Sequence, residues 1–411
     1  ISLSKFFPEV MEDYRFPEFN SKDAIQTWLT SLEAYINEPA VNKCVRQISY
    51  LATTITEDNK IAWLLKAISF LDLTTLNNDD TTTTVEQLCE NAATPIKDLP
   101  FQWDKPLHTA AVCVYPSKIK DARNTLKRLK KTNIIKIASG KKRNISFDLV
   151  GVTILSNIFF ASVAAGFPSG LFPLETRIQE VRLAIEYGAH EIDVVIDRSL
   201  VLNHQWMMLF QELLSIRALC PKNKERTVRL KVIISSGELF NLKDVYKASM
   251  VALFAGADFI KTSTGKDLVN ATLQAGIVMC RAIKEFQRLA GIKTGFKPAG
   301  GIKTAQDALE WMVLVKEELG NDWLTNDRFR IGASSLLENI SNEIMKTYEN
   351  KPISRSLEDF ENQISEGDND EGDSKDKKDE EDDKDDADNK EDVEDKDKGK
   401  NKDKNKKSNW V

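Results

Sequence analysis

The 411-residue sequence has few residues of the kinds that hold metal ions or form disulfides. Its three histidines stand far apart, which argues against a histidine-centred triad or metal site: His108, His190 and His204. Its five cysteines are also scattered, with no Cys-x-x-Cys pair: Cys44, Cys89, Cys113, Cys220 and Cys280. This pattern argues against structural zinc and predicts no metal or other cofactor. It favours reduced thiols in the cytoplasm, with the nucleus as the alternative.

A basic surface is also missing. The net charge is −6, but residues 366–411 hold 20 acidic and 12 basic side chains, so this tail carries −8 and the remaining chain only +2. A nearly neutral body argues against nucleic-acid binding. The tail has too little apolar content to offset the entropy of ordering, and we expect residues 351–411 to be disordered. A solubilising tail is the simpler interpretation, and contact with basic partners is the alternative.

The first residues lack the charged-then-apolar pattern of a secretion signal. We expect residues 1–20 to form a weakly ordered arm. Residues 21–67 contain three helical patterns, the second of them from 38 to about 53, and these helices are predicted to pack on the main body and to cover one end of it.

The rest of the chain repeats one unit, a short apolar run followed by an amphipathic segment. Strands that alternate with helices predict a parallel sheet, and eight such units predict a closed (β/α)₈ barrel, or TIM barrel, over residues 68–350. A doubly wound sheet is the alternative, but no Gly-x-Gly-x-x-Gly follows the first run. The runs lie at residues 68–72, 110–114, 161–167, 191–196, 230–234, 258–262, 295–299 and 329–333.

One interval does not fit the repeat. Ile137-Ala138-Ser139 resembles a strand start that is repeated at Phe160-Ala161-Ser162, and the long apolar stretch between them superficially resembles a membrane span. Asp148 and Asn157 within the stretch favour instead an insertion at 140–160, such as an unspliced intron would produce. We expect this insertion either to pack outside the barrel or to disrupt the third strand.

Polar side chains gather at the ends of the apolar runs, where a barrel of this kind carries its chemistry. Lys261, at the end of the sixth run, is either a snorkelling lysine or an amine that burial makes nucleophilic. Lys297 would add a neighbouring cation that disfavours protonation of Lys261. Asp193 would be an ion-pair partner, a proton-transfer group, or both. The complete set at the strand ends is Asp72, Cys113, Asp193, Lys231, Lys261, Lys297 and Ser334.

A phosphate site is predicted at the last two strand ends. Glycines free backbone N–H groups there, and a helix begins at about Ser335, which together favour an anion. Lys266 adds positive charge. The residues are Gly300, Gly301, Gly332, Ser334 and Ser335.

Seven segments together resemble the deoxyribose-phosphate aldolase family in its eukaryotic form, over about residues 24–350. They are Asp72-Leu73-Thr74-Thr75-Leu76, Ala111-Val112-Cys113-Val114-Tyr115-Pro116, Ala165-Gly166-Phe167-Pro168-Ser169-Gly170, the segment 191–195, Lys261-Thr262-Ser263-Thr264-Gly265-Lys266, the segment 295–301 and Gly332-Ala333-Ser334-Ser335-Leu336-Leu337.

The resemblance implies a lyase that cleaves 2-deoxy-D-ribose 5-phosphate reversibly to D-glyceraldehyde 3-phosphate and acetaldehyde, without a metal. It implies that Lys261 forms a Schiff base, Lys297 tunes it, Asp193 relays protons and Lys231 assists. Phosphate and substrate binding would fall to Lys266, Gly300, Gly301, Ser334 and Ser335, with Gly265, Gly332, Asp72 and Cys113 contributing. A homodimer is compatible with this fold. The alternatives are another Schiff-base sugar-phosphate aldolase, or a catalytically impaired barrel that acts as a binding module.

Overall fold

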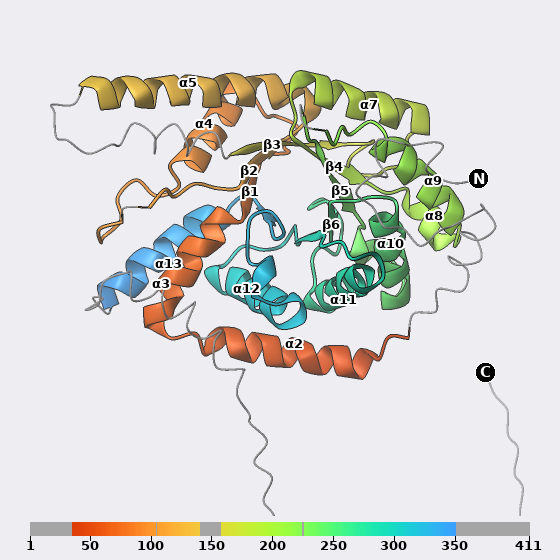
Figure 1. Cartoon of the computed structure of the whole chain (residues 1–411). Coiled ribbons are helices and arrows are strands. Elements are labelled where there is room, and N and C mark those ends of the chain that lie inside the picture. The colour runs from red at the N-terminus through yellow and green to blue at the C-terminus, as the bar shows by residue number, and fades with distance from the viewer. Residues whose placement is uncertain (1–34, 104, 140–157, 224–225, 351–411) are drawn as a thin grey trace, which may run out of the picture. The chain divides into compact units, whose positions relative to one another are not determined.

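The computed structural model describes residues 35–103, 105–139, 158–223 and 226–350. Within them eight parallel strands form one sheet in the order β7-β6-β5-β4-β3-β2-β1-β8. Figure 1 looks along the axis around which these strands and their helices are arranged. The strands are β1 Leu71–Thr74, β2 Ala111–Val114, β3 Phe159–Ala164, β4 Glu191–Val195, β5 Arg229–Ile233, β6 Phe259–Lys261, β7 Gly295–Lys297 and β8 Ile331–Ala333.

The sheet closes between β7 and β8. The N–H of Phe296 donates to the carbonyl of Arg328 at 2.8 Å, and the N–H of Gly332 donates to the carbonyl of Pro298 at 2.9 Å. Isolated parallel bridges join Phe296 to Phe329 and Ala299 to Gly332. The prediction of a (β/α)₈ barrel is therefore confirmed, and each of the eight predicted runs overlaps an observed strand.

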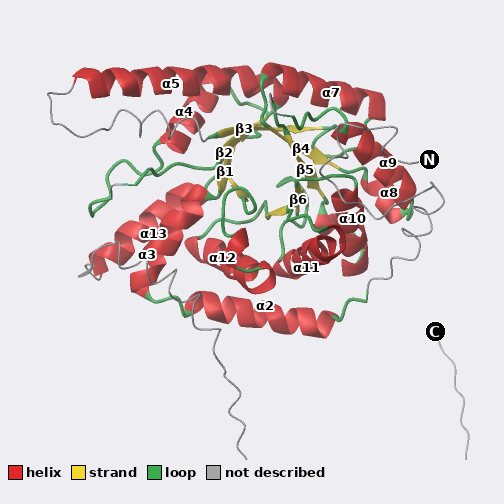
Figure 2. Cartoon of the chain, viewed as in Figure 1, coloured by secondary structure: helices red, strands yellow, loops and turns green. Residues whose placement is uncertain are grey.

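Helices surround the sheet (Figure 2). Local signals fix several of their ends: Thr304 and Asp307 form a capping box at the start of α12, and α11 ends at Gly291, whose φ is 72°. The helices are α2 Glu38–Thr53, α3 Glu57–Ser69, α4 Thr82–Ala93, α5 Ile119–Ser139, α7 Leu174–Tyr187, α8 Arg198–Leu202, α9 Trp206–Arg217, α10 Leu242–Phe254, α11 Leu273–Ala290, α12 Ala305–Leu319 and α13 Leu336–Asn350, with short 3₁₀ turns η2 Pro116–Lys118, η3 Ser236–Glu238 and η4 Asn321–Trp323.

The first described helices lie on the flank of the barrel. α2 packs against α11 and α12, and α3 packs against α12 and α13. In Figure 1 α2 lies outside α11 and α12 and leaves the centre of the barrel uncovered. The expectation that the N-terminal helices cover one end also involves the first helical pattern, which lies outside the described residues. The run predicted at 68–72 also began too early, because Ile68 and Ser69 finish α3. Ile68 is fully buried in that helix, and hydrophobicity alone does not separate a buried helix end from a strand.

The third strand is intact. Phe159 and Phe160, which the sequence analysis had assigned to an insertion, open β3 and pair with Ala111 and Val112 of β2. β3 pairs with β4 on its other edge. Of the two outcomes expected for the insertion, disruption of the third strand was therefore wrong, and residues 137–139, which resemble a strand start, belong to helix α5.

Several expectations fall on parts of the chain outside the described residues. They concern the arm at 1–20, the first helical pattern, most of the 140–160 segment and the acidic tail from 351 onward. Among the helices that the structure does describe, not one combines the length and the apolar character needed to cross a membrane.

The barrel interior carries both apolar and charged side chains. Because side chains alternate along a strand, Glu191, Asp193 and Val195 of β4 share the inner face, while Ile192 and Val194 join the core between sheet and helices. Lys231 occupies the corresponding inward position of β5 opposite Asp193. All of these side chains are fully buried. The fold thus brings charges from separate strands together inside the barrel.

Candidate active site

Three lysines from neighbouring strands meet one carboxylate. Lys261 and Lys297 end β6 and β7 and are register partners, so their side chains leave the sheet side by side. Both Nζ atoms contact the same oxygen, Oδ2 of Asp193, at 3.0 Å for Lys261 and 2.7 Å for Lys297. Nζ of Lys231 lies 3.0 Å from the other oxygen of Asp193. The structure therefore brings together the four residues that the sequence analysis placed in catalysis.

The three lysines differ in how many carboxylates they contact. Lys231 contacts Asp72, Glu191 and Asp193, and Lys297 contacts Asp72 and Asp193. Although burial opposes their charge, these carboxylates raise the pKa of both lysines. Among the ion pairs that the structure records, Lys261 has only the one to Asp193. Burial, together with the charge of Lys297, lowers its pKa despite the opposing effect of Asp193.

The carboxylate at the centre stays ionised. Burial alone would raise the pKa of Asp193, but the charges of Lys231, Lys297 and Lys261 lower it well below its usual range. The same balance lowers the pKa of Asp72. Of the three lysines, Lys261 is thus the one whose pKa is lowered, while the pKa values of Lys231 and Lys297 are raised. A neutral buried amine beside a fixed cation is the arrangement expected of a nucleophilic lysine.

A cavity of about 290 Å³ opens above this cluster and includes Lys261 in its wall. Its remaining wall comes mainly from the loops after β1, β6, β7 and β8, which all leave the carboxyl ends of their strands. Every glycine, serine and lysine predicted to bind phosphate lies in this wall: Gly265, Lys266, Gly300, Gly301, Gly332, Ser334 and Ser335. The prediction that these residues share one site agrees with their placement.

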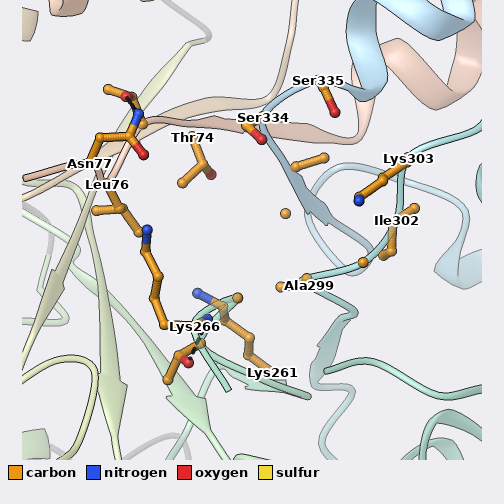
Figure 3. Close-up of a pocket in the computed structure, with 17 residues that line it drawn as sticks. Thr74, Leu76, Asn77, Lys261, Lys266, Ala299, Ile302, Lys303, Ser334 and Ser335 are labelled. Atoms are coloured by element: carbon orange, nitrogen blue, oxygen red, sulfur yellow. Dashed lines mark hydrogen bonds between the residues drawn. The ribbon is translucent and has the colours of Figure 1, made fainter. Parts of the chain in front are cut away.

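Figure 3 shows two sides of the cavity. Ser334, Ser335 and Lys303 lie on one side, whereas the side chain of Lys266 extends toward Leu76 and Asn77. The first side combines two hydroxyls, a lysine and the start of α13 at Leu336, which is the composition of a phosphate site.

Two predicted residues lie below the cavity. Asp72 is fully buried; its carboxylate contacts Lys231 and Lys297 on one oxygen and Arg330 on the other, at 2.6 Å for the arginine. Cys113 is buried in the apolar part of the interior, and burial raises the pKa of its thiol. Neither side chain belongs to the cavity wall. Their expected part in substrate or phosphate binding becomes a supporting one, because neither presents a free polar atom to the cavity.

Several residues of the site were not predicted from the sequence. Lys303 lies two residues after Gly301, and this spacing from the glycine pair could have indicated it. Thr74, Thr75 and Asn77 also line the cavity, although no role was predicted for them; Thr74 and Thr75 belong to a family segment, and Asn77 follows it by one residue. Glu191 and Arg330 were missed because nothing in a linear sequence says which buried charges meet.

Gly332 gives space to the side chain of Lys297. A methyl group at this position would lie 3.1 Å from Cε of Lys297 and 2.9 Å from Cβ of Ala299. Both separations are shorter than ordinary contacts, so any larger residue would push against Lys297. Gly300 has a different constraint, because its φ is 82° and a Cβ there would lie 2.4 Å from Oδ1 of Asn270.

Among the described residues, no group of three or more histidine, cysteine, aspartate or glutamate side chains could hold a metal ion. The nitrogen atoms of Lys231, Lys297 and Arg330 occupy the space between the buried carboxylates.

Known proteins share both the sequence and the fold. The DeoC/LacD family aldolase model matches residues 66–341. The chain is 47% identical to the human deoxyribose-phosphate aldolase over 322 residues, which cover 77% of this chain and 91% of the human one. It is likewise 47% identical to the mouse deoxyribose-phosphate aldolase over 323 residues, with the same shares of the two chains.

A solved structure extends the comparison to the fold. A candidate deoxyribose-phosphate aldolase from Toxoplasma gondii matches with a TM-score of 0.54 and 22% identity, over 72% of this chain and 97% of that one. Identity at this level shows the barrel alone. The family match reaches further, since it runs through β1 to β8 and includes the segments that carry the buried lysines. The chain therefore belongs to the DeoC/LacD family of aldolases.

Proposed function

We propose that this chain is a deoxyribose-phosphate aldolase, a lyase that cleaves 2-deoxy-D-ribose 5-phosphate reversibly to D-glyceraldehyde 3-phosphate and acetaldehyde in deoxyribose phosphate catabolism. Its relatives in human and mouse carry this name and share nearly half of its residues over most of both chains. One observation supports the choice of nucleophile. Of the three buried lysines at Asp193, only Lys261 reaches the cavity wall, and only its pKa is lowered.

The reaction begins at the neutral amine. Nζ of Lys261 attacks the aldehyde carbon C1 of the open-chain sugar, and loss of water gives an iminium ion that is bound covalently to the enzyme. This cation draws electrons from the neighbouring bond. When the C3 hydroxyl loses its proton, the C2–C3 bond breaks, glyceraldehyde 3-phosphate leaves, and its electron pair forms an enamine on Lys261. Protonation at C2 and hydrolysis then release acetaldehyde and restore the amine.

Protons move through the charges next to that nitrogen. Oδ2 of Asp193 contacts Lys261 and Lys297 together, so it lies beside the atom that carries the substrate. We assign to this carboxylate the relay of protons from the C3 hydroxyl and to C2, with Lys297 as the adjacent donor. Lys231 and Asp72 hold the carboxylate and the donor in place from below. The fixed cations also disfavour protonation of Lys261 between turnovers.

Reduction with borohydride tests the proposal directly. Addition of borohydride to the enzyme with 2-deoxyribose 5-phosphate should reduce the iminium ion to a stable secondary amine. Peptide mapping by mass spectrometry should place the adduct on Lys261, while Lys266 and Lys303 of the same cavity serve as internal controls and stay unmodified. An adduct on another lysine would overturn the assignment, as would a folded sample that forms no adduct. Sugar phosphates with a hydroxyl at C2 serve as the comparison that separates this substrate from those of other Schiff-base aldolases.

The substrate phosphate is assigned to the side of the cavity formed by Lys303, Ser334 and Ser335, with Gly300 and Gly301 beside it. Lys303→Met should raise KM about 10- to 100-fold and change kcat less, because the lost contact forms before and persists through the chemical step. Kinetics with 2-deoxyribose, which lacks the phosphate, provide the control and should change little. Equal losses with both sugars would contradict a phosphate role for Lys303.

We place the reaction in the cytoplasm. All five cysteines are free thiols in the structure, which suits a reducing compartment. A homodimer, and contact between the acidic tail and basic partners, stay proposals that follow from the sequence.

A further inference from the structure

One buried arginine, Arg330, lies at the amino-terminal end of the barrel strands, which we call the floor of the barrel. Arg330 lies one residue before β8, and its side chain is completely buried. Its guanidinium group sits against the rings of Phe159 and Phe259, with 5.3 Å and 5.7 Å between its central carbon and the ring centroids. Gly295 makes room for this packing, because a methyl group there would lie 2.3 Å from the Phe259 ring. A charged group held this firmly inside a protein needs a compensating partner.

Arg330 has two such partners. Its Nη1 atom donates to Asp72 at 2.6 Å and to Glu191 at 3.1 Å, and its Nη2 atom donates to Glu191 at 2.8 Å. Asp72 in turn contacts Lys297, and Glu191 lies 2.5 Å from Lys231. Both of these lysines contact Asp193, which holds Lys261. An unbroken chain of ion pairs thus runs from the floor to the nucleophile.

The charges in this series of ion pairs balance without Lys261. Among the described residues that face the interior, the carboxylates are Asp72 from β1 and Glu191 and Asp193 from β4. The cations with raised pKa values are Lys231 from β5, Lys297 from β7 and Arg330 before β8. Three negative charges meet three positive ones, and Lys261 is the seventh group.

Inside the barrel, the other described groups add no net charge. Lys266 and Lys303 lie above the cluster, in the cavity wall that they share with Lys261, and they are the same in every variant compared below. Cys113 of β2 is a buried thiol whose pKa is raised, and β3 contributes only Phe159, Ala161 and Val163 to the interior. At the rim of the floor, Arg229 contacts Glu191 at 3.3 Å and also pairs with the exposed Asp327 at 2.5 Å. The balance inside the barrel therefore depends on Arg330, the cation placed farthest along the chain of pairs from Lys261.

We infer that Arg330 is a positioning residue of the aldolase, whose buried charge completes a balance of three carboxylates and three cations and so leaves Lys261 as the uncharged amine. The inference rests on the proposed function and deepens it. Arg330 touches no part of the cavity; it acts through Asp72 and Glu191, which hold Lys297 and Lys231. Without its charge the cluster would be one unit negative, and a proton on Lys261 would restore neutrality.

The sign of the effect follows from electrostatics. A more negative cluster favours the ammonium form, so Arg330→Gln should raise the pKa of Lys261 and move the acidic limb of the kcat/KM profile to higher pH, by about one unit. Glu191→Gln removes a negative charge and should move the same limb to lower pH. The double variant Glu191→Gln/Arg330→Gln restores the balance, and its limb should return close to that of the native enzyme. Arg330→Lys keeps the charge and should shift the limb least among the single variants.

The experiment measures kcat/KM against pH for the native chain, these four variants and Arg217→Gln. Arg217 is a fully buried arginine paired with Asp258 at 2.7 Å, on α9 outside the barrel, so its replacement controls for the loss of a buried ion pair. The acidic limb of the kcat/KM profile should stay at the native pH in Arg217→Gln. Opposite shifts in Arg330→Gln and Glu191→Gln cannot arise from a general loss of stability, which would act on both in the same way.

A second readout separates the inference from the proposed function. Formaldehyde with cyanoborohydride methylates only uncharged amines, so the methylation rate of Lys261 against pH, relative to exposed lysines of the same sample, reports its protonation without any aldolase turnover. A native chain without aldolase activity would overturn the proposed function, and the labelling would still decide the role of Arg330. If the Arg330→Gln limb and labelling curve both coincide with those of the native chain, or if the double variant shifts as far as Arg330→Gln alone, the inference is wrong.

Discussion

Lys261→Met is expected to lower kcat/KM by about 10⁴-fold or more, because the variant loses the nucleophile on which every later step depends. Methionine fills a similar volume, and Asp193 keeps its contacts with Lys231 and Lys297. The native structure should therefore survive, with thermal unfolding close to that of the native chain. Steady-state kinetics, circular dichroism and borohydride trapping on the same preparation would check these three expectations together.

Lys266→Met gives a matched comparison, since it removes a second lysine from the same cavity wall. This variant should retain borohydride trapping, whereas Lys261→Met should form no adduct. Residual trapping in Lys261→Met at a rate near that of the native enzyme would mean that another amine carries the substrate.

Asp193→Asn is expected to have the second large effect, because it should lower both the activity and the stability of the enzyme. Asparagine keeps the shape but loses the charge that three lysines share and the base that relays protons, so kcat should fall about 10³-fold or more. Removal of one partner from a buried ion-pair cluster costs about 3–5 kcal/mol of folding free energy. Single-turnover kinetics and urea unfolding measure the two consequences separately.

The pH dependence of this stability loss has a defined sign. The lysines lower the pKa of Asp193 below the value of about 4 that it has in an unfolded chain. The contribution of the carboxylate is therefore complete above pH 4 and fades as the pH falls below that value. The difference in unfolding free energy between native chain and Asp193→Asn should accordingly stay constant from pH 6 to 8 and shrink in acid. A difference that grows in acid would contradict an ionised Asp193.

Much of this architecture could be predicted from the sequence, because short runs of neighbouring residues mark each strand. Each strand is a short apolar run that ends in a polar residue, so the eight runs and the residues at their ends could be located without knowing their neighbours. Lys261, Lys297 and Asp193 were identified in this way. The two lysines meet at a single oxygen of Asp193 because of the register and order of the strands. The pairing of the strands determines both, and the composition of the sequence does not.

Most residues that were not predicted from the sequence act through contacts with distant parts of the chain. Arg330 and Glu191 matter through partners more than one hundred positions away in the chain, at 258 and 139 residues of separation for the contacts Arg330 makes with Asp72 and Glu191. Phe159 was misassigned because a hydrophobic stretch without a period cannot show where a strand begins. Lys303 is different: it follows the glycine pair closely and could have been found by extending the phosphate turn by two residues.

The junction between α5 and β3 has a consequence for how this family tolerates change. Helix α5 ends at Ser139 and β3 begins at Phe159, so the segment that connects them joins the barrel where strands start, whereas the cavity is built where strands end. Catalysis depends mainly on the side of the barrel where the strands end. Segments can therefore be added on the side where the strands start without a change in the chemistry. Phe159 sets the limit of this freedom, because it packs on Arg330. An ancestral chain could gain residues before this phenylalanine, but a substitution at the ring itself would be felt at the floor of the active site.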